Sequence, residues 1–323
     1  MYQYEQFMEE IRERLVEQLN NGREEYKIKI VNVPKNNGIM RKGLNVEGKQ
    51  ETVSSVYYLE NNYRDYLDGE SVDTIVKNIL NDLQGQSYDH IYNHFNLQDA
   101  KDRIYYSLIN EKENQNYLKD KPYKEMEDLA VIYKIRMSDN NEFYTTTITK
   151  NLMDSWGIDQ EELHNIAEKN TPQLLPMSFR PLSDVIPLLS EEEGPAFYVL
   201  SNDQLIEGAS AILYPGVKEA IYKQLGGDYY VVPSSIHETL ILKKSEEFEG
   251  EELNNIIRSV NETLDPTDIL GDHVYEVREG KELVPIFSVE DNFDIAYEKF
   301  EIHNQERQEQ SIQESANFTI IQM

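Results

Sequence analysis

The sequence contains no cysteine. Disulfide bonds, thiol catalysis and cysteine-ligated metals are therefore excluded, and the composition suits a reducing compartment. The sequence also lacks any run of about 18 apolar residues, so we expect no transmembrane helix. The first ten residues carry three acidic side chains and no basic one, which is the wrong charge for a signal or transit peptide. Together these absences predict a cytoplasmic protein.

Basic residues are scarce as well. Lys and Arg number 31 against 60 Asp and Glu, which gives a formal net charge of −29. This charge repels nucleic-acid phosphates and anionic membranes, so we expect neither direct nucleic-acid binding nor membrane binding. An acidic surface keeps a protein soluble, and it also suits a basic protein as partner. Neither Gly-x-Gly-x-x-Gly nor Gly-x-x-x-x-Gly-Lys occurs, and no cofactor is expected.

The residues that are present indicate a folded chain. Its 323 residues suggest about two domains, and 10% aromatics with 22 Tyr argue against disorder. Apolar residues at helical spacing alternate with short runs of period two. We predict an α+β fold of short antiparallel strands and hairpins with helices packed on one face, in two lobes. The expected division is an N-terminal lobe over residues 1–122, a C-terminal lobe over 123–289, and a Gln/Glu-rich tail over 290–323 that is helical or disordered.

Local patterns place the individual elements. The Asn-Gly step in Val33-Pro-Lys-Asn-Asn-Gly38 predicts a turn, because Asn and Gly accept positive φ. Asp159 followed by Glu162 predicts a capped helix start. Residues 172–195 hold five of the 11 prolines and predict a long loop or linker. Predicted helices cover 4–19, 71–85, 97–118, 159–171, 217–225 and 246–264. Predicted strands cover 26–33, 39–46, 53–59, 129–137, 143–149, 197–200, 209–214, 229–232, 236–242 and 274–277.

Four stretches carry a family resemblance: Val33-Pro-Lys-Asn-Asn-Gly38, Leu213-Tyr-Pro-Gly-Val217, Pro233-Ser-Ser-Ile-His-Glu238, and Asn261-Glu-Thr-Leu-Asp-Pro266 followed by Val274-Tyr275. In combination they resemble a family of bacterial proteins that is described as a domain of unknown function and is common in gut Firmicutes. The resemblance covers most of the chain, from about Phe7 to Val277. It implies one shared architecture and brings no activity, cofactor or catalytic residue.

The first candidate site is Pro233-Ser-Ser-Ile-His-Glu238. If this segment runs into a strand, Glu238 shares the apolar face, and burial would raise the pKa of its carboxyl as in a general acid. The alternative is that Glu238 anchors a loop by accepting backbone N–H bonds. His237 with Ser234 or Ser235 suggests nucleophilic catalysis, but no Gly-x-Ser-x-Gly elbow supports it.

Two further histidine patterns are candidates. Asp272 and His273 precede the last predicted strand and reach His237 only if the fold brings them together; otherwise they form a pair in a surface loop. His90 and His94 are four residues apart, which places both rings on one face of a helix and suits zinc, with Asp89 or a distant acid as third ligand. Two histidines do not make a site, so no metal is assigned.

The leading functional hypothesis is a cytoplasmic, non-enzymatic module that binds or regulates a protein. The acidity permits a sharper version, in which the chain is an inhibitor or nucleic-acid mimic that occupies a basic groove. The alternative is a hydrolase-like enzyme with its site around His237 and Glu238. The expected partner is an unidentified protein, and the acidic charge of the chain suits a basic one.

Overall fold

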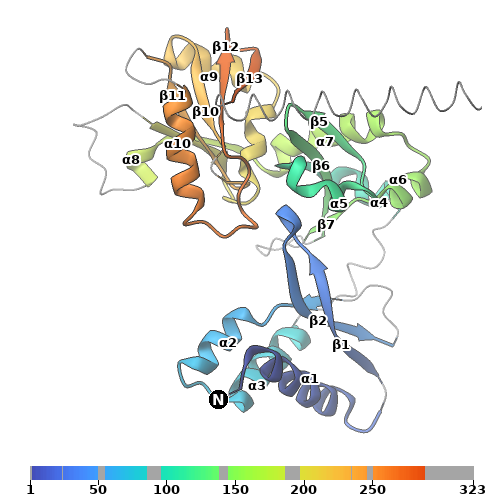
Figure 1. Cartoon of the computed structure of the whole chain (residues 1–323). Helices are drawn as coiled ribbons and strands as arrows, with labels where there is room; N and C mark the ends of the chain where they lie inside the picture. The colour runs from blue at the N-terminus through green and yellow to red at the C-terminus, as the bar shows by residue number, and fades with distance from the viewer. Residues whose placement is uncertain are drawn as a thin grey trace, which may run out of the picture.

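The computed structural model describes residues 2–23, 25–49, 55–85, 96–137, 145–185, 197–233, 235–245 and 250–287. These residues form three antiparallel sheets with helices around them (Figure 1). The predicted α+β fold is therefore confirmed. Some predictions concern residues outside the described ranges: those at His90, His94 and Ser234, and the predicted tail over 290–323.

The first lobe, residues 2–85, is a three-stranded sheet in the order β1-β2-β3, with helices on one face. Its apolar core draws on alternate residues of β1 and β2, and on residues of α1 and α3 that recur at helical spacing. Asn21 ends α1 in a left-handed conformation. The elements are α1 (Tyr4–Asn20), β1 (Tyr26–Pro34), 3-10 helix η1 (Asn36–Gly38), β2 (Met40–Gly48), β3 (Ser55–Tyr57), α2 (Glu60–Leu67) and α3 (Val72–Gly85).

The second lobe, residues 96–287, starts with a sheet in which β4, β7 and β5 all pair with β6. The Asp159 side chain accepts a hydrogen bond from the Glu162 N–H at the start of α7, as predicted. The elements are α4 (Leu97–Ala100), η3 (Lys101–Arg103), β4 (Ile104–Asn110), η4 (Lys112–Asn114), α5 (Gln115–Leu118), β5 (Tyr123–Met126), β6 (Leu129–Arg136), β7 (Thr145–Thr147), α6 (Lys150–Trp156) and α7 (Gln160–Leu174).

The prediction of one helix over 97–118 is wrong. Its middle is β4, which pairs with β6 over its whole length, and only short helical turns flank it. Six successive residues of β4, from Ile104 to Ile109, are buried. A strand covered on both faces shows no alternation, so its run of apolar residues also fits a helical period. Pairing with β6 decides in favour of the strand.

The second lobe continues with a six-stranded sheet in the order β13-β12-β10-β11-β9-β8. The 3-10 helix η5 and α9 pack on one face of this sheet, and α10 packs on the other. The elements are β8 (Met177–Pro181), α8 (Leu182–Val185), β9 (Phe197–Asn202), η5 (Gly208–Leu213), α9 (Val217–Leu225), β10 (Tyr229–Val232), β11 (Thr239–Lys243), α10 (Gly250–Asn261), β12 (Val274–Arg278) and β13 (Glu282–Ile286).

Two local predictions in this region need correction. A strand was expected over 209–214, but residues 208–213 form the 3-10 helix η5. A loop was expected over 172–195, but this range holds the end of α7 together with β8 and α8. Pro172 lies inside α7 and does not stop it. Pairing with β9 makes residues 177–181 a strand at the edge of the sheet, where proline is tolerated.

Two separate apolar cores support the two lobes. One is formed by residues between Tyr4 and Leu83, and the other extends across both sheets of the second lobe. The expected domain boundary after residue 122 stays a prediction. Strands from both sides of that position, β4 and β6, belong to one sheet.

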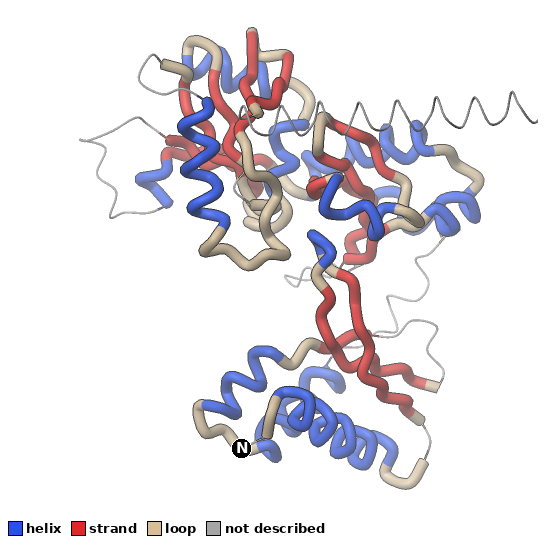
Figure 2. The backbone as a smooth tube through the Cα atoms, in the orientation of Figure 1, coloured by secondary structure: helices blue, strands red, loops and turns tan. Residues whose placement is uncertain are grey.

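The tip of the β1–β2 hairpin joins the two lobes (Figures 1 and 2). Asn37 and Gly38 have φ angles of 57° and 67°, so the predicted positive-φ turn is confirmed. The Asn37 N–H donates to Asn114 Oδ1 at 2.9 Å, and Asn114 Nδ2 donates to Asn36 Oδ1 at 2.8 Å. Asn114 is 1% exposed, and Asn36 and Asn37 are half-buried, so the contact is largely shielded from water on the side of the second lobe.

The same tip also contacts the segment before β12. Asn36 Nδ2 donates to Thr267 O at 2.9 Å, and Asn37 Nδ2 donates to Pro266 O and Ile269 O, both at 2.8 Å. Two of the family-like stretches, the hairpin turn and the Asn261–Pro266 run, are thus brought together in space.

We expect Asn114→Ala to lower the free energy of unfolding by about 1–3 kcal/mol, because the Asn37 N–H and the Asn36 side-chain oxygen Oδ1 lose this partner at a part-buried junction. Urea denaturation measures the change. Asn116→Ala is the matched control, since that side chain is exposed and accepts one bond from Lys119. Equal effects of the two substitutions would contradict the buried junction.

Candidate functional site

His237 lies in the segment between β10 and β11. The Ser235 hydroxyl accepts hydrogen bonds from the backbone N–H groups of His237 and Glu238, at 3.1 and 3.2 Å. This is a local side-chain turn, and it commits the serine hydroxyl to the backbone. β11 starts only at Thr239, so the strand alternation expected for Glu238 does not apply. Glu238 is half-buried.

The His237 ring faces a different set of residues from those expected. Its Nδ1 accepts a hydrogen bond from the Glu207 N–H at 3.2 Å, and its Nε2 lies 3.5 Å from Asp268 Oδ1. In the neutral ring the proton is therefore assigned to Nε2, on the side of Asp268. The ring is 33% exposed, and among the described residues no serine hydroxyl bonds to it. These contacts fix the His237 ring against the Glu207 loop, and among the described residues no nucleophile is aligned with the ring.

Glu207 is the polar centre beside this histidine. The Tyr105 hydroxyl donates to its Oε2 at 2.9 Å, and Lys134 forms an ion pair with its Oε1. Burial raises the pKa of Tyr105 well above 10, and the charge of Glu207 adds to the effect. The three residues belong to β4, β6 and the β9–η5 connection. Nothing local in the sequence marks these contacts, and sequence reasoning missed them.

The backbone next to Glu207 is tightly constrained. Glu207 has φ 53°, which is unusual for a residue with a side chain. At Gly208, a Cβ would lie 2.2 Å from Ser201 Oγ and 2.5 Å from His237 O. Only glycine fits there. The strained turn thus sets the position of the Glu207 N–H that donates to His237.

His273 forms a second, separate cluster. Its Nδ1 lies 3.0 Å from Asp272 Oδ1 and its Nε2 lies 3.3 Å from Asp128 Oδ1, while the Tyr275 hydroxyl donates to Asp128. The expected surface-loop pair is correct for Asp272, which is exposed, but wrong for His273, which is 5% exposed. The rings of Tyr275 and Phe287 cover it, with centroids 5.2 and 4.6 Å away.

The carboxylates of Asp128 and Asp272 determine the protonation state of His273. Burial disfavours the protonated ring, but the bonds to Asp128 and Asp272 and their charges outweigh burial and raise the pKa of His273 to about 9. The bond to His273 lowers the pKa of Asp272 in turn. A histidine held protonated between two carboxylates is a poor general base near neutral pH. Within the described part of the chain, no hydrogen bond or ion pair joins this cluster to His237.

The described ranges contain neither a metal cluster nor a membrane-spanning helix. No group of three or more His, Asp or Glu residues in these ranges is arranged to hold a metal ion. Nor does any helix there combine the length and the apolar character that crossing a bilayer requires.

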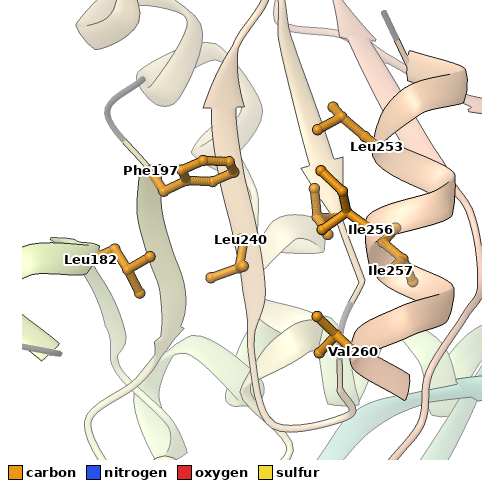
Figure 3. Close-up of a pocket in the computed structure, with 8 residues that line it drawn as sticks. Leu182, Phe197, Leu240, Leu253, Ile256, Ile257 and Val260 are labelled. Atoms are coloured by element: carbon orange, nitrogen blue, oxygen red, sulfur yellow. The ribbon is translucent and has the colours of Figure 1, made fainter. Parts of the chain in front are cut away.

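An apolar trough lies on the α10 face of the six-stranded sheet (Figure 3). Its volume is about 510 Å³, which includes space open to solvent. In Figure 3 the α10 side chains form one wall, Leu182 and Phe197 lie opposite, and Leu240 lies between them. All the residues that line it are apolar: Leu182, Phe197, Val232, Leu240, Leu253, Ile256, Ile257 and Val260.

Two residues of the α10 wall are exposed. Ile256 is 53% exposed and Val260 is 42% exposed, whereas Leu253 and Ile257 are buried against the sheet. The helix predicted over 246–264 includes all four residues, and the prediction did not separate the exposed ones from the buried ones. The apolar stripe formed by these four residues of α10 is wider than the contact between α10 and the sheet. This width is the signal that sequence reasoning missed.

Comparison with known proteins supports one conclusion. A model described as a family of unknown function (DUF5688) matches residues 4–278. The chain belongs to this family. The match runs from the first residue of α1 to the last residue of β12, so both lobes are part of the family's architecture. No curated protein and no solved structure matched the chain.

We expect stability to fall at alkaline pH. The folded-state pKa of His273, about 9, lies above its ordinary value of 6.5, so its contribution is complete below pH 6.5 and is lost as the pH rises through 9. The slope is roughly 1.4 kcal/mol per pH unit between these limits. Denaturation of the wild type and of His273→Gln between pH 6 and 10 checks this. Parallel curves for the two proteins would refute the assignment.

We also expect Lys134→Met to lower the unfolding free energy by about 3 kcal/mol, because the Glu207 carboxylate then loses its counter-ion in a nearly buried place. The double variant Lys134→Met with Glu207→Gln should lose less than the sum of the single changes. Arg23→Met is the control, since the pair of Arg23 with Glu25 is exposed. A thermal-unfolding cycle in which the two changes simply add would rule out the coupling.

Proposed function

We propose that this chain is a non-enzymatic protein-binding module and that the trough beside α10 is its binding surface. One observation carries the proposal: Ile256 and Val260 are exposed in a trough whose lining is entirely apolar. Contiguous exposed apolar surface is characteristic of interaction sites. Fully burying a side chain of this kind contributes about 1.5–3 kcal/mol, so the two residues can anchor a partner.

The composition of the trough favours a protein over a small substrate. Sites for small polar molecules place a few polar groups among apolar ones to orient the ligand. The trough offers none in its lining. Apolar side chains of a protein partner need no such groups, because their affinity comes from burial and shape.

Charge indicates which proteins fit. The chain carries a formal net charge of −29, and Asp184 on α8 and Glu252 on α10 are exposed carboxylates within two residues, along the chain, of the lining residues Leu182 and Leu253. Opposite charge speeds association and selects partners. A basic partner is therefore part of the proposal. An inhibitory role at a basic groove is its sharper form, and the lack of cysteine supports a cytoplasmic setting.

A hydrolase-like activity at His237 and Glu238 stays a prediction with less support. One ring nitrogen of His237 already accepts from the Glu207 N–H, and the Ser235 hydroxyl bonds to backbone. Catalysis by a serine would require that hydroxyl to turn toward the ring.

The test is a selection of peptides from a displayed random library against the full chain. We expect the selected peptides to bind wild type, and to bind Ile256→Glu and Val260→Glu at least tenfold more weakly, a loss of about 1.4 kcal/mol or more. Both residues are exposed, so the fold should persist. Asn255→Glu is the matched control, since it adds the same charge at an exposed α10 position outside the trough.

Two results would contradict the proposal. The first is that no peptide is selected. The second is that the selected peptides bind wild type, Ile256→Glu and Asn255→Glu equally well.

A further inference from the structure

We infer that the element which occupies the trough is an amphipathic α-helix of a partner protein, lying beside α10 with basic residues along the margins of its apolar stripe. The inference rests on the proposed function and specifies its partner. Three features of the described residues support it: the backbone pairing of the sheet, the space left beside α10, and the charge at the rim.

The backbone of the trough floor is fully paired. β11 lies between β10 and β9, and β9 lies between β11 and β8, so both are interior strands. An extended peptide adds to a sheet through the free N–H and C=O groups of an edge strand, and these strands have no free edge. A strand laid across this face would bury its own backbone groups without partners. A helix satisfies those groups internally and can lie on an apolar face.

The free space has the width of one helix. α10 covers the side of the sheet formed by β10 and β12. Strands are about 4.8 Å apart, so the face that α10 leaves free, from β11 across β9 to β8, is about 10 Å wide. A helix with its side chains is about 10–12 Å across, and packed helices lie about 8–10 Å apart. One further helix therefore fits between α10 and Leu182.

The wall of the trough is suited to such a partner. Ile256 and Val260 are four residues apart on α10, so their side chains form a ridge along one face of the helix. Residues at i, i+3, i+4 and i+7 of a second helix can pack against this ridge and reach Leu240 on the floor.

The rim specifies the flanks of the partner helix. Asp184, Glu252 and Glu262 are exposed, and each lies within two residues along the chain of a residue that lines the trough. The apolar lining gives no electrostatic preference, so these carboxylates and the net charge of −29 determine which charge the flanks of the partner helix carry. Lysine or arginine beside the apolar stripe meets these carboxylates.

The experiment uses three synthetic peptides of equal length and identical Leu and Lys content with the full chain. The first places Leu at i, i+3, i+4 and i+7, the second alternates Leu and Lys, and the third has a shuffled order. Fluorescence anisotropy with each labelled peptide measures affinity. We expect the helical-pattern peptide to bind at least tenfold more tightly than the other two. Ile256→Glu should remove that advantage, and Asn255→Glu should leave it unchanged.

The outcomes separate the inference from the proposed function. Tightest binding of the alternating peptide, with loss in Ile256→Glu, overturns the helical partner and leaves protein binding at the trough intact. If each of the three peptides binds Ile256→Glu as tightly as Asn255→Glu, charge attraction alone accounts for binding. This result overturns both the inference and the proposed function.

Two other occupants would also overturn the inference. If Phe318→Ser with Ile320→Ser and Ile321→Ser in the full chain raises peptide affinity tenfold, the end of the chain itself covers the trough. If sedimentation shows a dimer that Ile256→Glu dissociates, a second copy is the occupant. A monomer whose peptide affinity is unchanged by the triple substitution supports a foreign helix.

Discussion

The polar contact between the two lobes centres on one buried side chain, Asn114. Its amide accepts from the Asn37 N–H and donates to the Asn36 side chain, so the tip of the first lobe's hairpin is fixed against the second lobe. The same tip bonds to carbonyl groups between Pro266 and Ile269. A junction made of amides is directional and has to be fully satisfied, because burial makes each missing bond costly. The apolar cores of the two lobes are separate, so polar contacts link the lobes: these amide bonds and the ion pair of Arg41 with Asp265.

Polar contacts of the same kind organise the interior of the second lobe. Glu207 connects the turn after β9 to Lys134 and Tyr105 in the neighbouring sheet, and His237 packs against the Glu207 backbone. His273 is held between Asp128 and Asp272. In both places the histidine is committed to fixed partners. His237 and His273 thus hold loops and strands in place in this structure.

Part of the apolar surface of α10 stays exposed in the described structure. α10 covers only one side of its sheet face, and Ile256 and Val260 extend beyond that contact. Exposed apolar side chains in a chain with 28% charged residues are a local departure from the composition of the whole.

The sequence by itself determined the elements with strong local signals. The opening helix has apolar residues at helical spacing, the Asn37-Gly38 turn needs positive φ, and Asp159 caps its helix through a side chain three residues from its partner. These effects act within a few residues, so the α+β class and much of the first lobe could be predicted. β4 could not, because a strand buried on both faces loses its alternation.

Only the tertiary structure decided which side chains meet. Lys134 and Glu207 are 73 residues apart and Asn37 and Asn114 are 77 apart, and no local pattern links them. The exposure of Ile256 depends on how many strands α10 covers, which is a property of the assembled sheet. Local propensity acts along the chain, whereas burial and charge pairing act through space, and the candidate site of this protein is made by the second kind of interaction.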